Sequence, residues 1–266
     1  MKKIYVPQPK RAMSVIVFAS GGGGNLNAAI EESKQTPHML SVDLVITDRL
    51  GIPAIDIAQR HGSMVIDMDF EKMCGRWSER RKNSYSARLY KSKAEQFHNM
   101  VYTHIRNIER KRGRKFDLAV LSYHRWIHGK LLRYFQNRMI NQHAGDLTVI
   151  NNGQRAYCGI NPVLMSLKAG ETRTRTSTFL VDEGHDTGAI LCQGPLVHYT
   201  GTYPITKERA GRHEIKQKRQ SDWPSLRFAL RGIAQGHFSV SSKKHFDSTR
   251  IIFYQGHPLP YGGISL

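Results

Sequence analysis

The most constraining feature of this chain is a short apolar segment that runs directly into four consecutive glycines. Residues 13–19 are rich in β-branched and aromatic side chains and are too few for a buried helix, so we expect a buried strand. After the glycines at positions 21–24, Leu26, Ala29 and Ile30 recur at helical spacing. A strand, a glycine loop and a helix in this order are typical of an open α/β sheet that holds a phosphate group.

The same alternation continues along the chain and predicts one α/β domain with a Rossmann-like, mostly parallel, twisted sheet flanked by helices. We expect further strands at residues 42–47, 64–66, 116–122, 139–143, 176–181 and 190–199 and near 238 and 251–254. We expect helices at residues 52–61, 129–137, 161–169, 204–220 and 224–234, and one long basic amphipathic helix over residues 84–112. The domain would cover residues 13–257, after an N-terminal extension of residues 1–12 and before a C-terminal tail of residues 258–266.

The charge of the chain is unusual and predicts anionic ligands. Lys and Arg number 40 against 21 Asp and Glu, a formal net charge of +19. The segment that begins at Arg76 and ends at Lys115 holds thirteen of these cations and only three glutamates, with Trp77, Tyr85, Tyr90 and Tyr102 among them. Basic residues interleaved with aromatic ones could bind nucleic acid weakly, whereas a solvated basic helix face explains the same pattern without a ligand.

Several classes of protein are disfavoured by composition. No apolar run approaches the roughly 18 residues that a membrane span needs, so we expect no membrane partner. The first residues carry charge without the apolar stretch of a signal peptide, so we expect a cytoplasmic protein. Cys74, Cys158 and Cys192 have no Cys-x-x-Cys spacing, which predicts reduced thiols and no metal site.

The glycine loop is the first candidate binding site. Gly22, Gly23, Gly24 and Asn25 precede a helix, where glycine allows close backbone approach and the free N–H groups of the first turn attract an anion. The loop matches neither the dinucleotide motif nor the P-loop, because Asn25 and Leu26 follow the last glycine. We therefore expect a monophosphate there; the alternative is a simple flexible turn.

Asn141, Gln142 and His143 form the second candidate site, at the end of a late parallel strand. Side chains alternate along a strand, so Asn141 and His143 should share one face and Gln142 should take the other. A carboxamide and an imidazole can together stabilise the oxyanion that forms when an amine attacks a carbonyl. Taken alone, an Asn-x-His pair more often has a structural role.

The third candidate is an acidic, glycine-rich loop over residues 182–188. A carboxylate from this loop, best placed at Asp186, would favour the charged form of His143 and could relay protons. The alternative is an acidic turn between strands, in which Asp and Gly serve only the turn geometry.

Together these segments resemble the folate-dependent formyltransferases, closest to the glycinamide ribonucleotide (phosphoribosylglycinamide) type. Ser20, Gly21, Gly23, Asn25 and Leu26 match the loop Ser-Gly-x-Gly-x-Asn-Leu of that family, and Asn141 with His143 matches its Asn-x-His. The acidic loop around Asp186 is also similar to that of methionyl-tRNA formyltransferases. The similarity covers nearly the whole chain except a longer basic stretch near residues 70–95.

The resemblance implies transfer of a formyl group from 10-formyltetrahydrofolate, as a co-substrate and without a metal, to a small phosphorylated amine of purine biosynthesis. Asn141 would bind the formyl oxygen, His143 would stabilise the oxyanion, and Asp186 would keep His143 charged. The glycine loop would hold the acceptor's phosphate, and a homodimer is compatible with the family. The residues implied for folate binding are Leu121, Ser122, Tyr123, His124, Arg125, Trp126, Asp182, Glu183 and Gly184.

Two departures from the family pattern bear on the acceptor. The family's Pro-Ser-Leu-Leu-Pro after Asn-x-His is replaced here by the five residues 144–148, Ala-Gly-Asp-Leu-Thr. An ungapped alignment on Trp223 and Pro224 puts Arg219 where the ribonucleotide enzymes have the glutamate that holds the ribose hydroxyls. Arginine is only a donor, so this substitution predicts a changed acceptor. The alternatives are therefore a tRNA-linked or nucleotide-sugar amine as acceptor, hydrolysis of 10-formyltetrahydrofolate, and a nucleic-acid-binding protein on the same fold.

Overall fold

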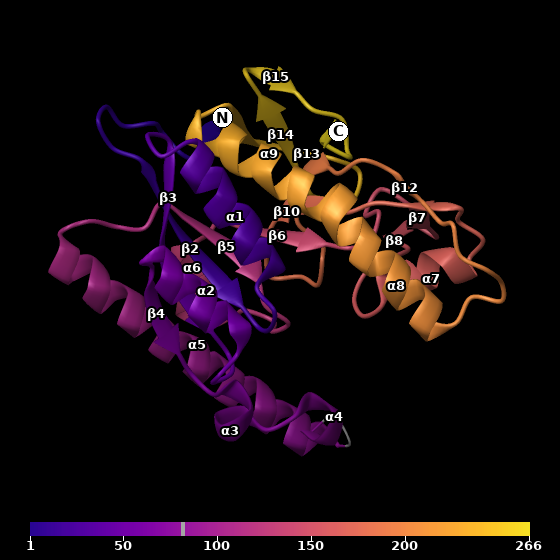
Figure 1. The fold of residues 1–266 in the computed structure, drawn as a ribbon, viewed down its shortest axis with the longest axis horizontal. Helices are drawn as coiled ribbons and strands as arrows, with labels where there is room; N and C mark the ends of the chain where they lie inside the picture. Colours follow the sequence, from indigo (N-terminus) through magenta and orange to yellow (C-terminus); the bar gives the residue numbers. More distant parts are fainter. Residues whose placement is uncertain (81–82) are drawn as a thin grey trace.

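A computed structural model describes residues 1–80 and 83–266 and shows an eight-stranded, mostly parallel sheet at the centre of the molecule (Figure 1). The order of the strands is β16-β11-β10-β6-β5-β2-β3-β4. The five that run parallel are β6 (Met139–His143), β5 (Leu118–Ser122), β2 (Met13–Ala19), β3 (Leu40–Thr47) and β4 (Met64–Asp67). The antiparallel strand β10 (Ser177–Leu180) joins them to β11 (Ile190–Gln193) and the edge strand β16 (Ile264–Ser265). The predicted fold class is thus confirmed.

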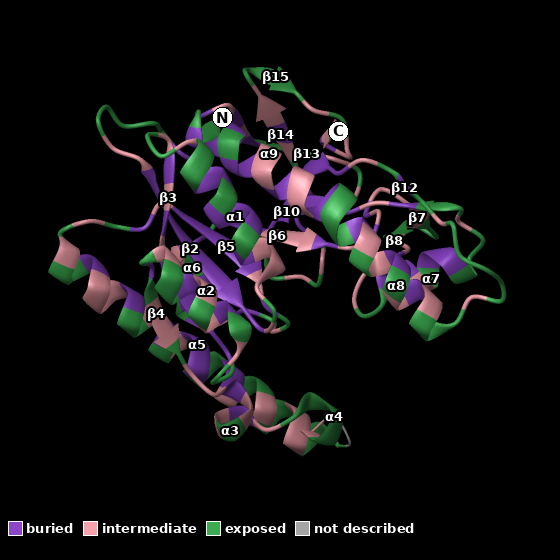
Figure 2. Ribbon diagram, in the orientation of Figure 1, coloured by how far each residue is buried: buried purple, intermediate pink, exposed green. Residues whose placement is uncertain are grey.

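Both faces of this sheet are covered by helices, which explains why every residue of the strand β2 is buried (Figure 2). Val15 and Val17 of β2 pack in one buried cluster with α1 (Gly24–Gln35), α2 (Pro53–His61) and α9 (Trp223–Ala234). Ile16 and Phe18 of the same strand pack on the opposite side with α3 (Phe70–Cys74), α5 (Ser84–Arg112) and α6 (Gly129–Tyr134). The helices cover the faces of the sheet, so the loops at the ends of its strands can form a site.

The long helix α5 has the predicted bounds, Ser84–Arg112, and local sequence explains both ends. The Asn83 side chain accepts a hydrogen bond of 2.8 Å from the Ser86 N–H, and Gly113 follows the helix with a φ of 63°, which glycine tolerates. Before this helix the structure adds α3 and the short α4 (Trp77–Arg80), which the sequence patterns did not predict. Arg81 and Lys82 of the predicted basic segment lie outside the described residues.

The second half of the chain departs most from expectation. The predicted helix over residues 204–220 is α8 (Lys207–Gln217), and it continues through a π-helical turn, η1 (Lys218–Asp222), straight into α9. The strand expected over residues 190–199 is divided into β11 and β12 (Val197–His198), because Gly194 and Pro195 interrupt it. The helix expected at residues 161–169 is α7 (Pro162–Lys168).

A smaller antiparallel sheet lies beside α9. Its order is β1 (Lys2–Lys3), β13 (Phe238–Lys244), β14 (Arg250–Tyr254) and β15 (His257–Pro258), so the first residues of the chain pair with a late strand. Two further pairs of short strands complete the structure: β7 (Ile150–Asn151) with β8 (Gln154–Arg155), and β9 (Arg173–Thr174) with β12. In the described part of the chain, no helix has both the length and the apolarity that a bilayer crossing needs.

Candidate active site

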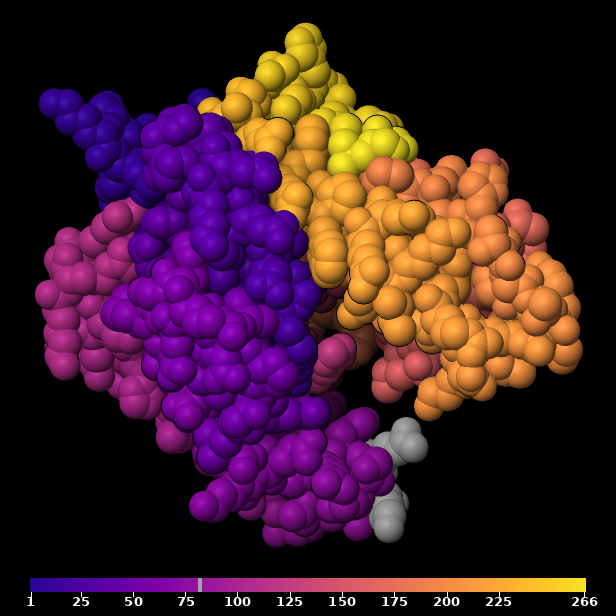
Figure 3. All heavy atoms as spheres, in the orientation of Figure 1, coloured from indigo at the N-terminus to yellow at the C-terminus, as the bar shows by residue number. Residues whose placement is uncertain are grey.

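A cavity of about 390 Å³ opens where β2, β5 and β6 end, at the carboxyl edge of the parallel sheet. The space-filling view shows a hollow in this part of the molecule, between the indigo and purple segments and the orange segment that holds α8 (Figure 3). Open α/β sheets place their ligands at this edge, because the loops after parallel strands meet there. The cavity brings together eleven of the predicted site residues: Asn25, Leu121, Ser122, Tyr123, His124, Arg125, Trp126, Asn141, His143, Gly184 and Asp186.

His143 and Asp186 form an ion pair at this cavity, and both side chains are largely buried. The Nδ1 atom of His143 lies 3.4 Å from Oδ2 of Asp186, and Nε2 lies 2.6 Å from the carbonyl oxygen of Tyr157. One oxygen atom thus lies next to each ring nitrogen, and together they fix the orientation of the imidazole.

The position of Asp186 is fixed from two sides. Its carboxylate accepts a hydrogen bond of 2.8 Å from the Gly159 N–H, and its carbonyl oxygen accepts one of 2.7 Å from the Arg155 side chain. Its φ of 55° is left-handed, a conformation that aspartate adopts more readily than most residues. The acidic loop thus aims one carboxylate at the histidine.

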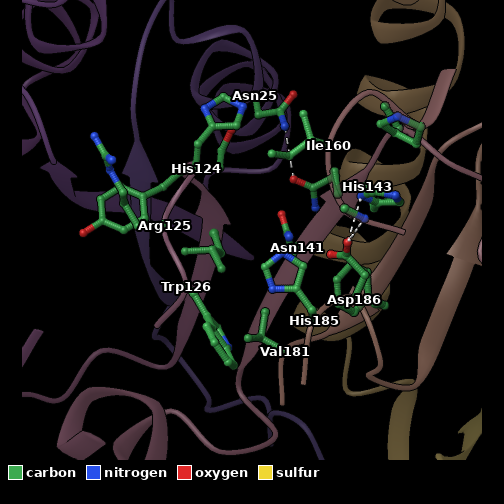
Figure 4. A pocket seen from close by; sticks show the side chains of 18 of the residues that line it. Asn25, His124, Arg125, Trp126, Asn141, His143, Ile160, Val181, His185 and Asp186 are labelled. Atoms are coloured by element: carbon green, nitrogen blue, oxygen red, sulfur yellow. Dashed lines mark hydrogen bonds and ion pairs between the residues drawn. The ribbon is translucent and has the colours of Figure 1, made fainter. Parts of the chain in front are cut away.

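The amide of Asn141 projects into the cavity near His143 and Asp186 (Figure 4). Gln142 also lines the cavity, contrary to the simple alternation expected of the strand. It does so because the Asn25 side chain, at the start of α1, donates a hydrogen bond of 3.3 Å to its Oε1 atom. Gln142 Nε2 is buried without a partner among the described residues.

The glycine loop lies beside the cavity, but only Asn25 lines it; Gly22, Gly23 and Gly24 do not. Gly23 has a φ of 73°, and a Cβ there would lie 2.8 Å from the Ile57 side chain, so the turn between β2 and α1 requires glycine. The helix α1 begins at this loop without a side-chain cap, which leaves the N–H groups of its first turn for a ligand or water.

The predicted folate segment, residues 121–126, forms one wall, but the guanidinium of Arg125 is already engaged. It contacts Asp48 at 2.5 Å and Glu71 at 3.2 Å and lies over the Phe70 ring. The Trp126 ring is partly exposed and donates a hydrogen bond of 3.2 Å to the Glu183 carbonyl. Arg125 thus anchors the wall to α3, and Trp126 lies at the opening.

Asp182 and Glu183 differ from the prediction, since neither lines this cavity; both line a neighbouring one. The Asp182 carboxylate accepts hydrogen bonds from the Gly184 N–H at 3.0 Å and from the Thr187 hydroxyl at 2.7 Å. These bonds close the acidic loop on itself. Asp182 is therefore a turn residue, as the alternative interpretation of the loop proposed, whereas Asp186 is not.

The expectation for Arg219 is wrong in this structure. Arg219 is exposed and does not line the cavity, whereas Lys218 and Asp222, at the two ends of the π-helical turn, do. A π-turn holds more residues than an α-turn and so changes which side chains face the sheet. An ungapped alignment has no signal for such a turn, so neither residue could be predicted from the sequence.

Asp222 is the most perturbed carboxyl group of the site. It is 4% exposed, its Oδ1 atom has no partner among the described residues, and burial raises its pKa to about 7, against the opposing effect of the Lys218 charge. A buried carboxyl group with a raised pKa and one oxygen without a partner, at the wall of a cavity, is typical of ligand-binding sites. Residues at the cavity that no sequence pattern predicted also include Ile160, Asn161, Val181 and Glu214.

Several known proteins have sequences similar to that of this chain. The trifunctional purine biosynthetic protein adenosine-3 of Drosophila melanogaster is 27% identical over 193 residues, which are 70% of this chain and 12% of that protein. The chain thus spans about an eighth of the length of this relative. The phosphoribosylglycinamide formyltransferase of Bacillus subtilis is 27% identical over 178 residues, which are 66% of this chain and 75% of the relative.

Solved structures share the fold at low sequence identity. A phosphoribosylglycinamide formyltransferase from Coxiella burnetii superposes with a TM-score of 0.65 at 20% identity and covers 96% of this chain and 100% of its own. A formyltetrahydrofolate deformylase from Pseudomonas syringae superposes with a TM-score of 0.61 at 14% identity and covers 91% of this chain and 66% of its own. A sequence model described as formyl transferase matches residues 13–197, well over half of the chain, and on that match the chain belongs to the formyl transferase family.

Proposed function

We propose that this enzyme transfers the formyl group of 10-formyltetrahydrofolate to the amine of a small phosphorylated acceptor, of the phosphoribosylglycinamide type. The observation that carries the proposal is the convergence of Asn141, His143 and Asp186 on one cavity whose far side is formed by Asn25 of the glycine loop. The names of the relatives described above support this acceptor. Residues 13–257 would form the catalytic domain, with residues 1–12 and 258–266 as additions.

The reaction needs groups that stabilise the negative charge on the formyl oxygen. When the amine attacks, the formyl oxygen becomes an oxyanion, which the Asn141 amide and the His143 imidazolium stabilise. The attacking nitrogen loses a proton, the carbon–nitrogen bond to the folate breaks, and the folate nitrogen gains a proton. Asp186, whose Oδ2 atom lies 3.4 Å from the Nδ1 atom of His143, would stabilise the positive charge of the imidazolium during the reaction.

The two ends of the cavity suit the two substrates. Asn25, the first turn of α1 and Lys218 supply donors and positive charge for the acceptor's phosphate. The Oδ1 atom of Asp222, which has no partner among the described residues, can accept hydrogen bonds from hydroxyl groups of the acceptor, which the exposed Arg219 cannot. The folate ring would lie against the wall of residues 121–126 and Gly184, with Trp126 at the opening.

A product analysis tests the proposal. The purified protein is incubated with 10-formyltetrahydrofolate, with and without phosphoribosylglycinamide, and the products are identified by mass spectrometry. We expect a formylated acceptor that forms only when both substrates are present. Formate released at the same rate without any acceptor would indicate hydrolysis instead, which the same three residues could catalyse with water in place of the amine.

A further inference from the structure

A second cavity, of about 330 Å³, lies between α8 and the loop that follows β12, outside the catalytic cavity. Three cations line one wall of it, and hydroxyl-bearing residues line the other. None of its described lining residues is a carboxylate. The complete lining is Tyr199, Thr200, Gly201, Thr202, Arg209, Arg212, His213 and Lys216.

The three cations, Arg209, Arg212 and Lys216, come from successive turns of one face of α8. Each is held by one contact: Arg209 donates to the Pro204 carbonyl, Arg212 pairs with Glu208, and Lys216 donates to the His198 carbonyl. An arginine has five N–H donors, so most donors of Arg209 and Arg212 remain free to face the cavity. These contacts orient the three side chains, and only the contact of Arg212 is with a carboxylate.

This arrangement has an energetic cost in the absence of an anion. Like charges three or four residues apart on a helix repel each other and destabilise it. The positive end of the α8 dipole lies at Lys207, in the turn next to Arg209, and adds to the same potential. Glu208 offsets only the charge of Arg212.

The opposite wall supplies uncharged donors. Thr200 and Thr202 carry hydroxyl groups, and both residues are exposed. Tyr199 is held in place, because its hydroxyl donates a hydrogen bond of 3.0 Å to the Thr202 carbonyl. His213 also lines the cavity and is buried. Burial lowers its pKa, and the charge of Lys216 lowers it further, which favours the neutral ring.

We propose that this cavity is a second phosphate-binding site, separate from the catalytic centre. Planar guanidinium groups bind phosphate oxygens two at a time, and hydroxyl groups complete the coordination of the remaining oxygens. The ligand is a phosphate group, either free or in the backbone of a nucleic acid. The proposal does not depend on the catalytic reaction, and it assigns part of the large positive charge to a defined place in the fold.

Nuclear magnetic resonance of the 15N-labelled full chain tests the site with inorganic phosphate as the probe, at a constant ionic strength of about 0.15 M. We expect the amide signals of Gly201 and Thr202 to shift with saturation. Replacement of both arginines, Arg209→Gln with Arg212→Gln, should raise the apparent Kd reported by these signals by about tenfold or more, because each removes a charge-assisted bond. The signal of Gly23 reports phosphate at the catalytic loop separately and should respond as in the wild type.

Three controls make the result decisive. Lys207→Gln removes one charge from the same helix outside the cavity and should leave the Kd unchanged; an equal weakening would show general charge attraction and overturn the site. The pair Arg209→Lys with Arg212→Lys keeps the charge but loses the paired guanidinium donors, so it should weaken binding less than the two glutamines do. Thermal unfolding confirms that each variant folds. No saturable shift at Gly201 and Thr202 would also overturn the proposal.

A single-stranded RNA oligonucleotide then identifies the source of the phosphate. Shifts of the same two amides at lower concentrations than inorganic phosphate requires would assign the site to a nucleic-acid backbone. Shifts with phosphate but none with the RNA would assign it to a free phosphate group.

Discussion

The Nδ1 atom of His143 lies 3.4 Å from Oδ2 of Asp186, although one residue ends a central strand and the other belongs to a loop beyond the next strand of the sheet. The same carboxylate oxygen accepts the Gly159 N–H, so three separate segments meet at one atom. The carboxylate is therefore held at a fixed distance from the imidazole. Substitution of either side chain then tests what that side chain contributes to turnover.

Replacing His143 with alanine tests the assigned role of the imidazole. We expect kcat to fall by about 10²–10⁴-fold, because the charged group next to the reacting oxygen is lost. Folate-analogue binding, measured by calorimetric titration, should change little, since residues 121–126 form a separate wall of the cavity. Activity within severalfold of the wild type would show that the assignment is wrong.

Asp186→Asn separates the charge of the carboxylate from its shape. Asparagine can still accept the Gly159 N–H, but it cannot stabilise a charged imidazole. We expect a loss of about tenfold to a hundredfold in kcat with a small change in KM, and a displaced pH profile of kcat. An unchanged kcat and profile would remove Asp186 from the mechanism.

Much of the catalytic constellation could be predicted from the sequence because it depends on local pattern. The strand Met139–His143 has the predicted bounds, and its position at the carboxyl edge of the sheet follows from the βαβ alternation. The sequence motif then selects Asn141, His143 and Asp186 from many similar residues, and the structure brings all three to one cavity. Their chemical roles remain predictions.

The rest of the site depends on geometry that no local pattern encodes. Lys218 and Asp222 reach the cavity through a π-turn, and Gln142 is drawn to it by Asn25 from a distant segment. Asp182 belongs to the same acidic loop as Asp186, yet its carboxylate accepts hydrogen bonds only from within that loop. Only the three-dimensional contacts distinguish these cases.

Gly145, in the loop that departs from the family pattern, has no room for a side chain. A Cβ there would lie 2.5 Å from the Tyr157 carbonyl oxygen and 2.9 Å from His143 Nε2. We therefore expect Gly145→Ala to displace the histidine, to destabilise the fold by about 1–3 kcal/mol and to lower kcat. Urea denaturation and steady-state kinetics measure the two effects.

The matched control for this substitution is Gly211→Ala, in the helix α8. A Cβ there meets nothing within 4 Å, so alanine should stabilise the helix by about 1 kcal/mol and leave turnover unchanged. Equal effects of the two substitutions would contradict the steric argument at Gly145.

The three free thiols differ in accessibility, and one of them borders the catalytic cavity. Burial raises the pKa of Cys74 to about 11 and that of Cys192 to about 12, so neither should react with maleimide near pH 7.5. Cys158 is only partly buried and precedes Gly159, which lines the cavity. We expect one labelled cysteine by peptide mass mapping, with slower labelling when a folate analogue is bound; labelling that is indifferent to the analogue would contradict the placement of the ligand.

Asp222 predicts a dependence of stability on pH, because its pKa is raised in the folded protein to about 7 by burial. An unfolded aspartate has a pKa near 3.9, so between about pH 4 and 7 the folded state holds a proton that the unfolded state has lost. Raising the pH through this window therefore destabilises the fold, by at most about 4 kcal/mol, and above it the contribution is constant. In Asp222→Asn this penalty is absent, so the variant's free energy of unfolding should rise relative to the wild type from pH 5 to 7 and then run parallel to it. Urea denaturation of both proteins at pH 5, 6, 7 and 8 measures the difference, and a constant difference over the whole range would show that the buried carboxyl group does not titrate in this window.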